Sequence, residues 1–263
     1  MSYKAQLDNI HYISEGSGEP IIFIHGVGLD HTIFKKQINY FSKDFRVIAY
    51  DMLGHGKSEK PNINYQLSYY VEQLNRLIID LNLKNPHIVG FSMGAMVAQL
   101  FAIKYPYKLK KLCLLNAVAK RNPKQQKGVL SRVEQVKKEG HHSTIDSALK
   151  RWFTEKYFTK HPDVIENIRT ILSNNPFDAY LESYTLFSVS DKMLWPKLDK
   201  IKAPTLIITG EKDTGSTPEM SLMLGKKIQH SEVAILPNIK HMAPIEASES
   251  VNNIIENFLR KEH

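Results

Sequence analysis

The fold is decided by residues 88–96, which read IVGFSMGAM. An apolar run leads into Ser92, which lies between two glycines and is followed by further apolar residues. The pattern indicates a strand that turns sharply into a helix. One interpretation is a glycine-bearing turn in which the serine is an ordinary helix N-cap. The other is a Gly-x-Ser-x-Gly turn that presents a nucleophile, and this would need partner residues elsewhere in the chain.

The steric demands of such a turn explain the two glycines. The serine takes a strained backbone conformation, and only small residues at Gly90 and Gly94 let the strand and the helix pass each other so closely. The turn lifts the Ser92 hydroxyl clear of the sheet and directs the following amide, that of Met93, toward a developing oxyanion. The strand before it and the helix after it favour the nucleophile.

Short apolar runs alternate with helical patterns along the chain, which predicts an α/β fold with a largely parallel sheet between helices. The expected strands form an opening hairpin at 4–7 and 10–14 and then occupy 20–26, 45–51, 86–92, 110–116, 204–210 and 232–237. The expected helices occupy residues 32–41, 67–81, 94–105, 217–228 and 244–260.

The region from about residue 118 to residue 200 breaks this alternation. It shows no strand pattern, is rich in Lys, Glu and aromatic residues, and carries helical spacing such as Leu149, Trp152 and Phe153. We therefore predict a helical insertion over residues 119–199, within a core formed by residues 1–118 and 200–263.

A serine hydroxyl needs a base, and the base needs a group that orients it. Asp213 follows the expected strand at 204–210, and His241 lies in the loop after the next strand. Both positions lie beyond the carboxyl ends of strands, where open α/β sheets build their sites, and the order Ser, acid, His is the one expected on such a scaffold. The alternative interpretation of Asp213 is a solvated loop carboxylate, and Glu211 is its nearest rival for the role of the acid. The alternative for His241 is a plain loop histidine.

A tetrahedral oxyanion needs two N–H donors. The Met93 amide is the first, and the loop after the strand at 20–26 suggests the Val27 amide as the second. The alternative for this loop is a simple turn that uses the backbone freedom of Gly26 and Gly28. The stretch GVGLDH is not a Gly-x-Gly-x-x-Gly fingerprint and the chain has no P-loop, so no nucleotide cofactor is expected.

Four other residues are weaker candidates for a functional role. His141 and His142 lack a second ligand cluster at metal-site spacing, so we expect surface histidines and no metal. His55 follows a strand and is expected to brace its loop. Trp152 either packs inside the insertion or faces a substrate pocket, and we retain it as a candidate substrate-binding residue.

Composition excludes several classes of protein. The chain has 263 residues, 42% of them hydrophobic, and a formal charge of +8. Its densest basic stretch, residues 119–128, lacks interleaved aromatics, so a solvated basic face is favoured over nucleic-acid binding. No apolar stretch is long enough to span a membrane, and no secretory signal is expected. The single cysteine, Cys113, cannot form an internal disulfide, which favours a cytoplasmic protein.

Five motifs together resemble the α/β-hydrolase superfamily over essentially the whole chain. They are FIHGVG at 23–28, DMLGHGKS at 51–58, GFSMG at 90–94, GEKDTGSTP at 210–218 and HMAPIE at 241–246. The resemblance implies an α/β-hydrolase fold with an eight-stranded, mostly parallel sheet, and a helical cap over the active site. The residues that match the family's catalytic triad are Ser92, Asp213 and His241.

Within the superfamily the chain is most similar to 3-oxoadipate enol-lactonases, mainly through residues 132–140, 148–172 and 180–191 of the insertion. Lys240 stands where relatives usually have a small residue, and Phe34 where many have tryptophan. Neither departure removes a catalytic group, but both leave the substrate open.

We therefore expect a cofactor-free serine hydrolase that cleaves a small carboxylic ester or lactone through an acyl-enzyme. The alternatives are a carbon–carbon bond hydrolase of a ring-cleavage product, a haloperoxidase-like esterase and a non-catalytic ligand receptor on the same scaffold. The sequence leaves open whether the protein is a monomer or a homodimer.

Overall fold

A seven-stranded sheet forms the centre of the protein. The structure is a computed structural model that describes residues 9–262. The strand order is β1-β3-β2-β4-β5-β6-β7; β1 is antiparallel to β3, and every other neighbouring pair is parallel. The strands are β1 (Tyr12–Glu15), β2 (Glu19–Ile24), β3 (Phe45–Tyr50), β4 (His87–Phe91), β5 (Leu112–Leu115), β6 (Thr205–Gly210) and β7 (Ser231–Leu236).

The sequence prediction of a mostly parallel sheet is confirmed, but the strand count differs. We predicted eight strands, whereas the described residues form seven. The expected strand at 4–7 lies outside the described residues. Within them, the second strand of the predicted hairpin, β1, pairs along its whole length with β3. Its partner therefore comes from about 35 residues further along the chain, a pairing that local patterns do not reveal.

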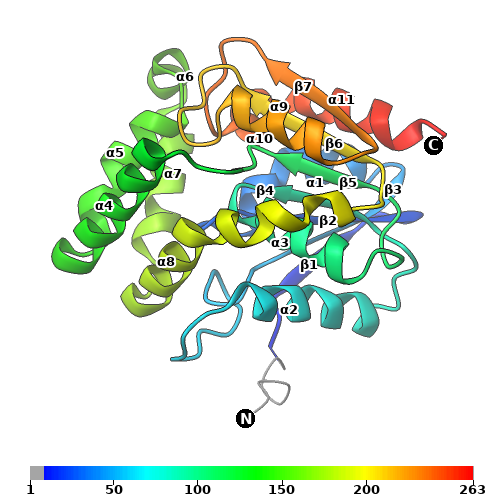
Figure 1. Cartoon of the computed structure of the whole chain (residues 1–263), viewed down its shortest axis with the longest axis horizontal. Helices are drawn as coiled ribbons and strands as arrows, with labels where there is room; N and C mark the ends of the chain where they lie inside the picture. Colours follow the sequence, from blue (N-terminus) through cyan, green and yellow to red (C-terminus); the bar gives the residue numbers. More distant parts are fainter. Residues whose placement is uncertain (1–8, 263) are drawn as a thin grey trace.

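Two groups of helices flank the sheet, in the arrangement that Figure 1 shows. The first group contains η2 (His31–Phe34), α1 (Lys35–Phe41), α10 (Ala243–Glu246) and α11 (Ser248–Arg260). The second contains α2 (Leu67–Asp80), α3 (Met93–Lys104), η3 (Trp195–Lys200) and α9 (Pro218–Lys227). The helix predicted over 244–260 is interrupted at Ala247, whose ψ of 36° separates α10 from α11.

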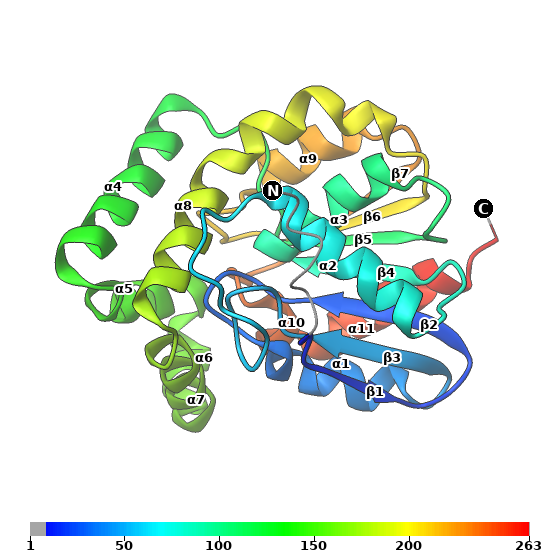
Figure 2. The ribbon, with the colours of Figure 1, turned by 90° about the horizontal axis from the view of Figure 1, so that it is seen from below.

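The chain between β5 and β6 is helical, as the sequence predicts. Its helices project beyond one end of the sheet in both views (Figures 1 and 2). They are α4 (Pro123–Glu139), α5 (His142–Trp152), α6 (Glu155–Lys160), α7 (Pro162–Ser173) and α8 (Phe177–Leu194). We refer to residues 123–194 as the helical insertion. The boundaries drawn at 119 and 199 stay a prediction.

None of the helices within residues 9–262 combines the length and the apolarity that crossing a membrane requires.

The parallel register gathers the functional loops at one edge of the sheet. Ile24 at the end of β2 lies opposite Gly90 of β4, so the loop after β2 lies beside Ser92. A Cβ placed on Gly26 would lie 3.2 Å from the Ser92 Cβ, which shows how closely the two loops approach. The loops after β6 and β7 reach the same edge because their strands are also parallel.

Buried histidines give the fold a pH-dependent stability. Burial lowers the pKa of His55 to about 3 and that of His87 to about 4, so both are neutral in the folded protein. In the unfolded chain each takes up a proton near pH 6.5. The unfolded state therefore binds more protons below that pH, and stability falls as the pH falls.

We predict that the free energy of unfolding decreases by roughly 1 kcal/mol per buried histidine for each pH unit below about 6.5. His31, whose pKa is raised by its hydrogen bond to Asp51, opposes this decrease near pH 6.5, where the unfolded histidine is only half protonated, and adds no slope once the pH is well below that value. Urea unfolding at pH 6.5 and pH 5.0 measures the decrease, and the His87→Gln variant should show a shallower one. Equal stabilities at the two pH values would contradict the prediction.

Candidate active site

Ser92 lies alone in the sharp turn between β4 and α3. Its φ of 54° and ψ of −112° place it in the left-handed half of the backbone map, which is strained for a residue with a side chain. A Cβ on Gly94 would lie 2.2 Å from the carbonyl oxygen of Ile24, and a Cβ on Gly90 would lie 2.4 Å from that of Gly94. Both glycines are therefore required by close backbone approaches, as the steric argument from the sequence predicts.

The structure brings Ser92, His241 and Asp213 into one hydrogen-bonded chain. The Nδ1 of His241 lies 2.7 Å from Oδ2 of Asp213, and its Nε2 lies 3.2 Å from Oγ of Ser92. Because a carboxylate only accepts, Nδ1 carries the proton and Nε2 is left free to accept the serine proton. All three side chains are buried, yet all three line the same cavity.

Asp213 is held as an anion by several donors. Burial on its own would raise its pKa, but the facing His241 and the hydrogen bonds outweigh burial and lower the pKa. Oδ1 accepts from the backbone amides of Gly215 and Ser216, and Oδ2 accepts from Asn116 at 2.9 Å as well as from His241. The carboxylate is therefore ionised and fixed in orientation.

Asn116 is a site residue that the sequence reasoning missed. It follows β5 directly, is fully buried, and takes a positive φ of 48°. The available signal was a single polar residue at the end of an apolar strand. Its partner Asp213 lies 97 residues away, so only the pairing of β5 with β6 reveals the contact.

We predict that Asn116→Ala lowers kcat roughly tenfold while changing KM little, because it removes one charge-assisted hydrogen bond that orients Asp213. Steady-state kinetics on the best ester substrate measures the effect, and urea unfolding separates it from a loss of folded protein. A variant with unaltered kcat would show that the amide is not needed to position the acid.

The two predicted oxyanion donors come from segments next to Ser92: Met93 follows it in the chain, and Val27 lines the same cavity. Neither the Val27 amide nor the Met93 amide donates a hydrogen bond to a residue in the described part of the chain. Val27 lines the cavity, whereas the Met93 side chain is buried and its amide opens helix α3. His25 braces the loop, since its Nδ1 lies 2.7 Å from the Gly26 carbonyl and its Nε2 accepts from the Met52 amide.

The cavity above Ser92 has a volume of about 510 Å³ and lies between the sheet edge and the helical insertion. Trp152 lines it, with its ring 5.9 Å from the ring of His241. The end of α5 is bound to the histidine loop by two backbone acceptors: the Trp152 carbonyl accepts from the Met242 amide, and the Lys150 carbonyl accepts from Lys240 Nζ. Lys240, a departure from the family pattern, thus attaches the insertion to the loop that carries His241.

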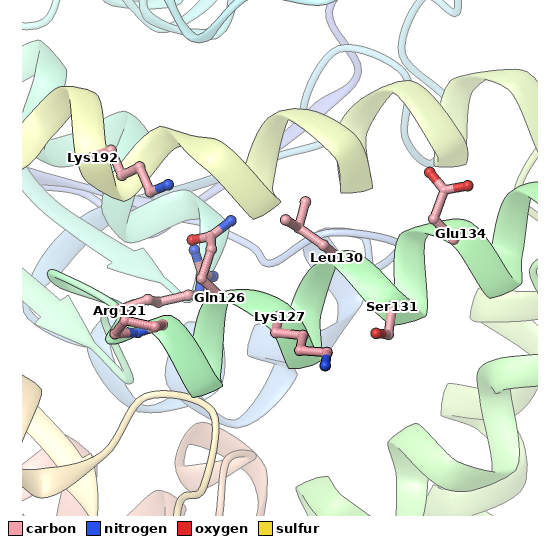
Figure 3. A pocket seen from close by; sticks show the side chains of 8 residues that line it. Arg121, Gln126, Lys127, Leu130, Ser131, Glu134 and Lys192 are labelled. Atoms are coloured by element: carbon pink, nitrogen blue, oxygen red, sulfur yellow. The ribbon is translucent and has the colours of Figure 1, made fainter.

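A second, larger hollow of about 750 Å³ lies between α4 and α8. Figure 3 shows side chains of α4, among them Lys127, Leu130 and Ser131, with Lys192 from α8. Its lining contains no hydroxyl–imidazole pair, and Ser92 and His241 are not part of it. The smaller cavity is therefore the candidate active site.

Two groups of histidines away from Ser92 make packing contacts or loop hydrogen bonds. His141 and His142 pack against each other with ring centroids 4.2 Å apart and an interplanar angle of 39°. His142 is exposed as predicted, but His141 is buried, so the prediction of a surface position was wrong for it. The donor atoms of His11, His31 and Asp51 lie within 4.8 Å of one another, but Asp51 already accepts from the amide and the ring of His31 and from the Lys57 amide. These bonds fix the loop after β3.

The comparisons with known proteins agree with this fold. Residues 19–248 match the family model described as alpha/beta hydrolase fold. An Acinetobacter baylyi protein, (E)-2-((N-methylformamido)methylene)succinate hydrolase, is 32% identical over 98% of both chains. The same organism's 3-oxoadipate enol-lactonase 2 is 25% identical over 96% of this chain and 93% of its own. The crystal structure of the enol-lactonase from Burkholderia xenovorans superposes with a TM-score of 0.89, at 26% identity and 96% coverage of both chains.

The chain belongs to the α/β-hydrolase family and is similar to its enol-lactonases.

Proposed function

We propose that the protein is a serine hydrolase that cleaves a small carboxylic ester or lactone through an acyl-enzyme intermediate. The observation that supports this most is the hydrogen-bonded chain from Ser92 through His241 to Asp213 beside a cavity. The strained turn at Ser92 supports it further, as do the amides of Val27 and Met93, which have no hydrogen-bond partner among residues 9–262.

In the proposed mechanism the Ser92 hydroxyl attacks the substrate carbonyl while His241 Nε2 takes its proton. Asp213 stabilises the imidazolium that forms and holds its tautomer. The tetrahedral oxyanion accepts hydrogen bonds from the amides of Val27 and Met93. His241 then returns the proton to the leaving oxygen, which leaves an acyl group on Ser92.

Deacylation repeats these steps with water as the nucleophile. His241 removes a proton from the water, and the second tetrahedral intermediate collapses to release the acid and Ser92. In a lactone the leaving alcohol remains attached to the acyl group, so a single hydroxy acid is released. The helical insertion covers the cavity and limits the access of bulk water to the intermediate.

A second candidate reaction is hydrolysis at a bond other than an ester. The relative that is 32% identical is named as the hydrolase of a methylene succinate that carries an N-methylformamido group, and that name contains no ester. A carbon–carbon bond hydrolase on this scaffold would use the same three side chains.

A substrate panel distinguishes these reactions. Wild-type protein and Ser92→Ala are assayed with p-nitrophenyl esters of increasing chain length, with lactones of several ring sizes and with vinylogous diketones. The proposal expects turnover of esters or lactones that depends on Ser92. Serine-dependent turnover of the diketones alone would instead assign carbon–carbon cleavage, and tight binding without turnover would assign a receptor.

A further inference from the structure

The helical insertion packs against the loop that carries Val27, the second proposed oxyanion donor. We refer to residues 25–29 as the oxyanion loop. Gly28 in this loop has a φ of 74°, and a Cβ placed on it would lie 2.6 Å from Cε2 of Tyr180 and 3.0 Å from Cδ2 of Leu172. Leu172 belongs to α7 and Tyr180 to α8, so both helices contact the oxyanion loop directly.

Asn175, in the connection between α7 and α8, forms a polar contact between the insertion and this loop. It is buried, and its Nδ2 donates to the Gly28 carbonyl at 2.8 Å. The same nitrogen lies 2.9 Å from the carbonyl oxygen of Ile171 and 3.1 Å from that of Leu172, in the last turn of α7. Because carbonyl oxygens only accept, these neighbours require the NH2 group of the amide at this place, and α7 holds that group in position.

The Gly28 carbonyl is connected to the Val27 amide through two peptide groups. The peptide between Gly28 and Leu29 accepts from Asn175 at its carbonyl. Its N–H, that of Leu29, donates to the Gly26 carbonyl at 3.3 Å. The Gly26 carbonyl belongs to the peptide whose N–H is that of Val27. A trans peptide is planar, so its carbonyl and its N–H point in opposite directions, and fixing the first fixes the second.

His25 holds the same Gly26 carbonyl directly. Its Nε2 accepts from the Met52 amide, so Nδ1 carries the proton and donates to the Gly26 carbonyl at 2.7 Å. The Gly26 carbonyl thus accepts two hydrogen bonds. Hydrogen bonds in a chain polarise one another, so a carbonyl that accepts strongly makes the N–H of its own peptide a better donor.

We propose that Asn175 is a positioning residue for the oxyanion donor, which orients and polarises the Val27 N–H through the carbonyls of Gly28 and Gly26. The insertion thereby takes part in stabilising the transition state as well as covering the cavity. This inference rests on the proposed function, because it concerns the N–H that faces the oxyanion formed when Ser92 attacks. That charge is absent from the bound substrate, so losing Asn175 should slow the chemical step and leave substrate binding nearly unchanged.

The kinetic test uses Asn175→Leu, which removes the donor and keeps a side chain of similar volume. We expect kcat on the best substrate to fall roughly 10- to 30-fold with KM changed less than about twofold, a smaller loss than the about 10²- to 10³-fold expected when an oxyanion donor is removed outright. Asn175→Asp keeps the shape but replaces the NH2 group by an acceptor oxygen, so its kcat should fall at least as far. Asn174→Leu and Asn174→Asp, at the exposed neighbouring position, are the matched controls and should retain the wild-type kcat.

Binding of a trifluoromethyl ketone separates positioning from a loss of folded protein. Ser92 Oγ adds to the ketone carbon, His241 takes the hydroxyl proton, and the carbonyl π electrons become an oxyanion that resembles the tetrahedral intermediate. Fluorine NMR detects this adduct and gives its Kd without turnover. We expect the Kd to rise in Asn175→Leu by about the same factor as kcat/KM falls. In a Ser92→Ala background, where no oxyanion forms, Asn175→Leu should leave the Kd unchanged.

The outcomes distinguish this inference from the proposed function. A Ser92 adduct that is weakened in Asn175→Leu, in a protein that hydrolyses no ester or lactone, would support the inference and refute the ester assignment. Unchanged kcat and ketone affinity in folded Asn175→Leu would overturn the inference and leave the proposed function standing. A higher KM with unaltered kcat would also overturn it, since Asn175 would then shape only the cavity. A wild type that forms no adduct would contradict both.

Discussion

Ser92→Ala is expected to reduce kcat on the best ester substrate by about 10⁴-fold or more, with a smaller change in KM. The substitution removes the only hydroxyl within hydrogen-bonding distance of His241 Nε2 among the described residues. What remains is the catalysis by the oxyanion donors and by substrate positioning alone. Stopped-flow or pH-stat kinetics over several enzyme concentrations measures the residual rate.

A matched control is Ser131→Ala, which removes an exposed serine hydroxyl on α4 outside the cavity. Its kcat should equal that of the wild type. Near-parental turnover by folded Ser92→Ala would refute the assignment of the nucleophile.

Asp213→Asn is expected to reduce kcat by roughly 10³- to 10⁴-fold. In the wild type the carboxylate accepts from four donors, among them His241 Nδ1. The Asn side chain would replace one carboxylate oxygen by an NH2 group, which donates and cannot accept from these donors. It would favour the His241 tautomer that is protonated on Nε2 and cannot take the Ser92 proton. The rate of the double variant Ser92→Ala/Asp213→Asn should be close to that of Ser92→Ala alone, because the residues act as a unit.

Glu211→Gln provides the control for charge at this loop. Glu211 is exposed and its carboxylate accepts from the Asn238 amide at 2.8 Å, so its loss should leave kcat within about twofold. A larger loss in Glu211→Gln than in Asp213→Asn would exchange the roles of the two acids. Strictly additive losses in the double variant would also contradict a concerted unit.

Features that depend on local sterics or on strand pattern could be predicted from the sequence. The turn at Ser92 follows from two glycines that must pass each other and the neighbouring strand within van der Waals distance. The parallel strands follow from continuous apolar runs, because they are covered on both faces. Strand pairing at the sheet edge and the exact ends of helices did not follow from these local patterns. The partner of β1 is β3, and the helix after His241 is interrupted at Ala247.

Features that depend on a partner far along the chain could not be predicted. The sequence left Asp213 and Glu211 as rivals, and only the structure shows which carboxylate reaches His241. Asn116 gave almost no signal because its partner lies in another loop. Arg121 and Arg151 look equivalent as residues, yet one is neutralised by Asp191, 70 residues away, and the other is not paired with any described acid.

The reactivity of Ser92 in the folded protein tests the central claim most directly. A fluorophosphonate is incubated with the wild type, with His241→Ala and with urea-unfolded wild type, and the modified residue is located by peptide mass spectrometry. The account predicts one phosphonyl group per folded chain, on Ser92, and labelling slowed by orders of magnitude in the other two samples because the serine then lacks its base. Folded wild type that stays unlabelled at Ser92, or that labels no faster than His241→Ala, would contradict it.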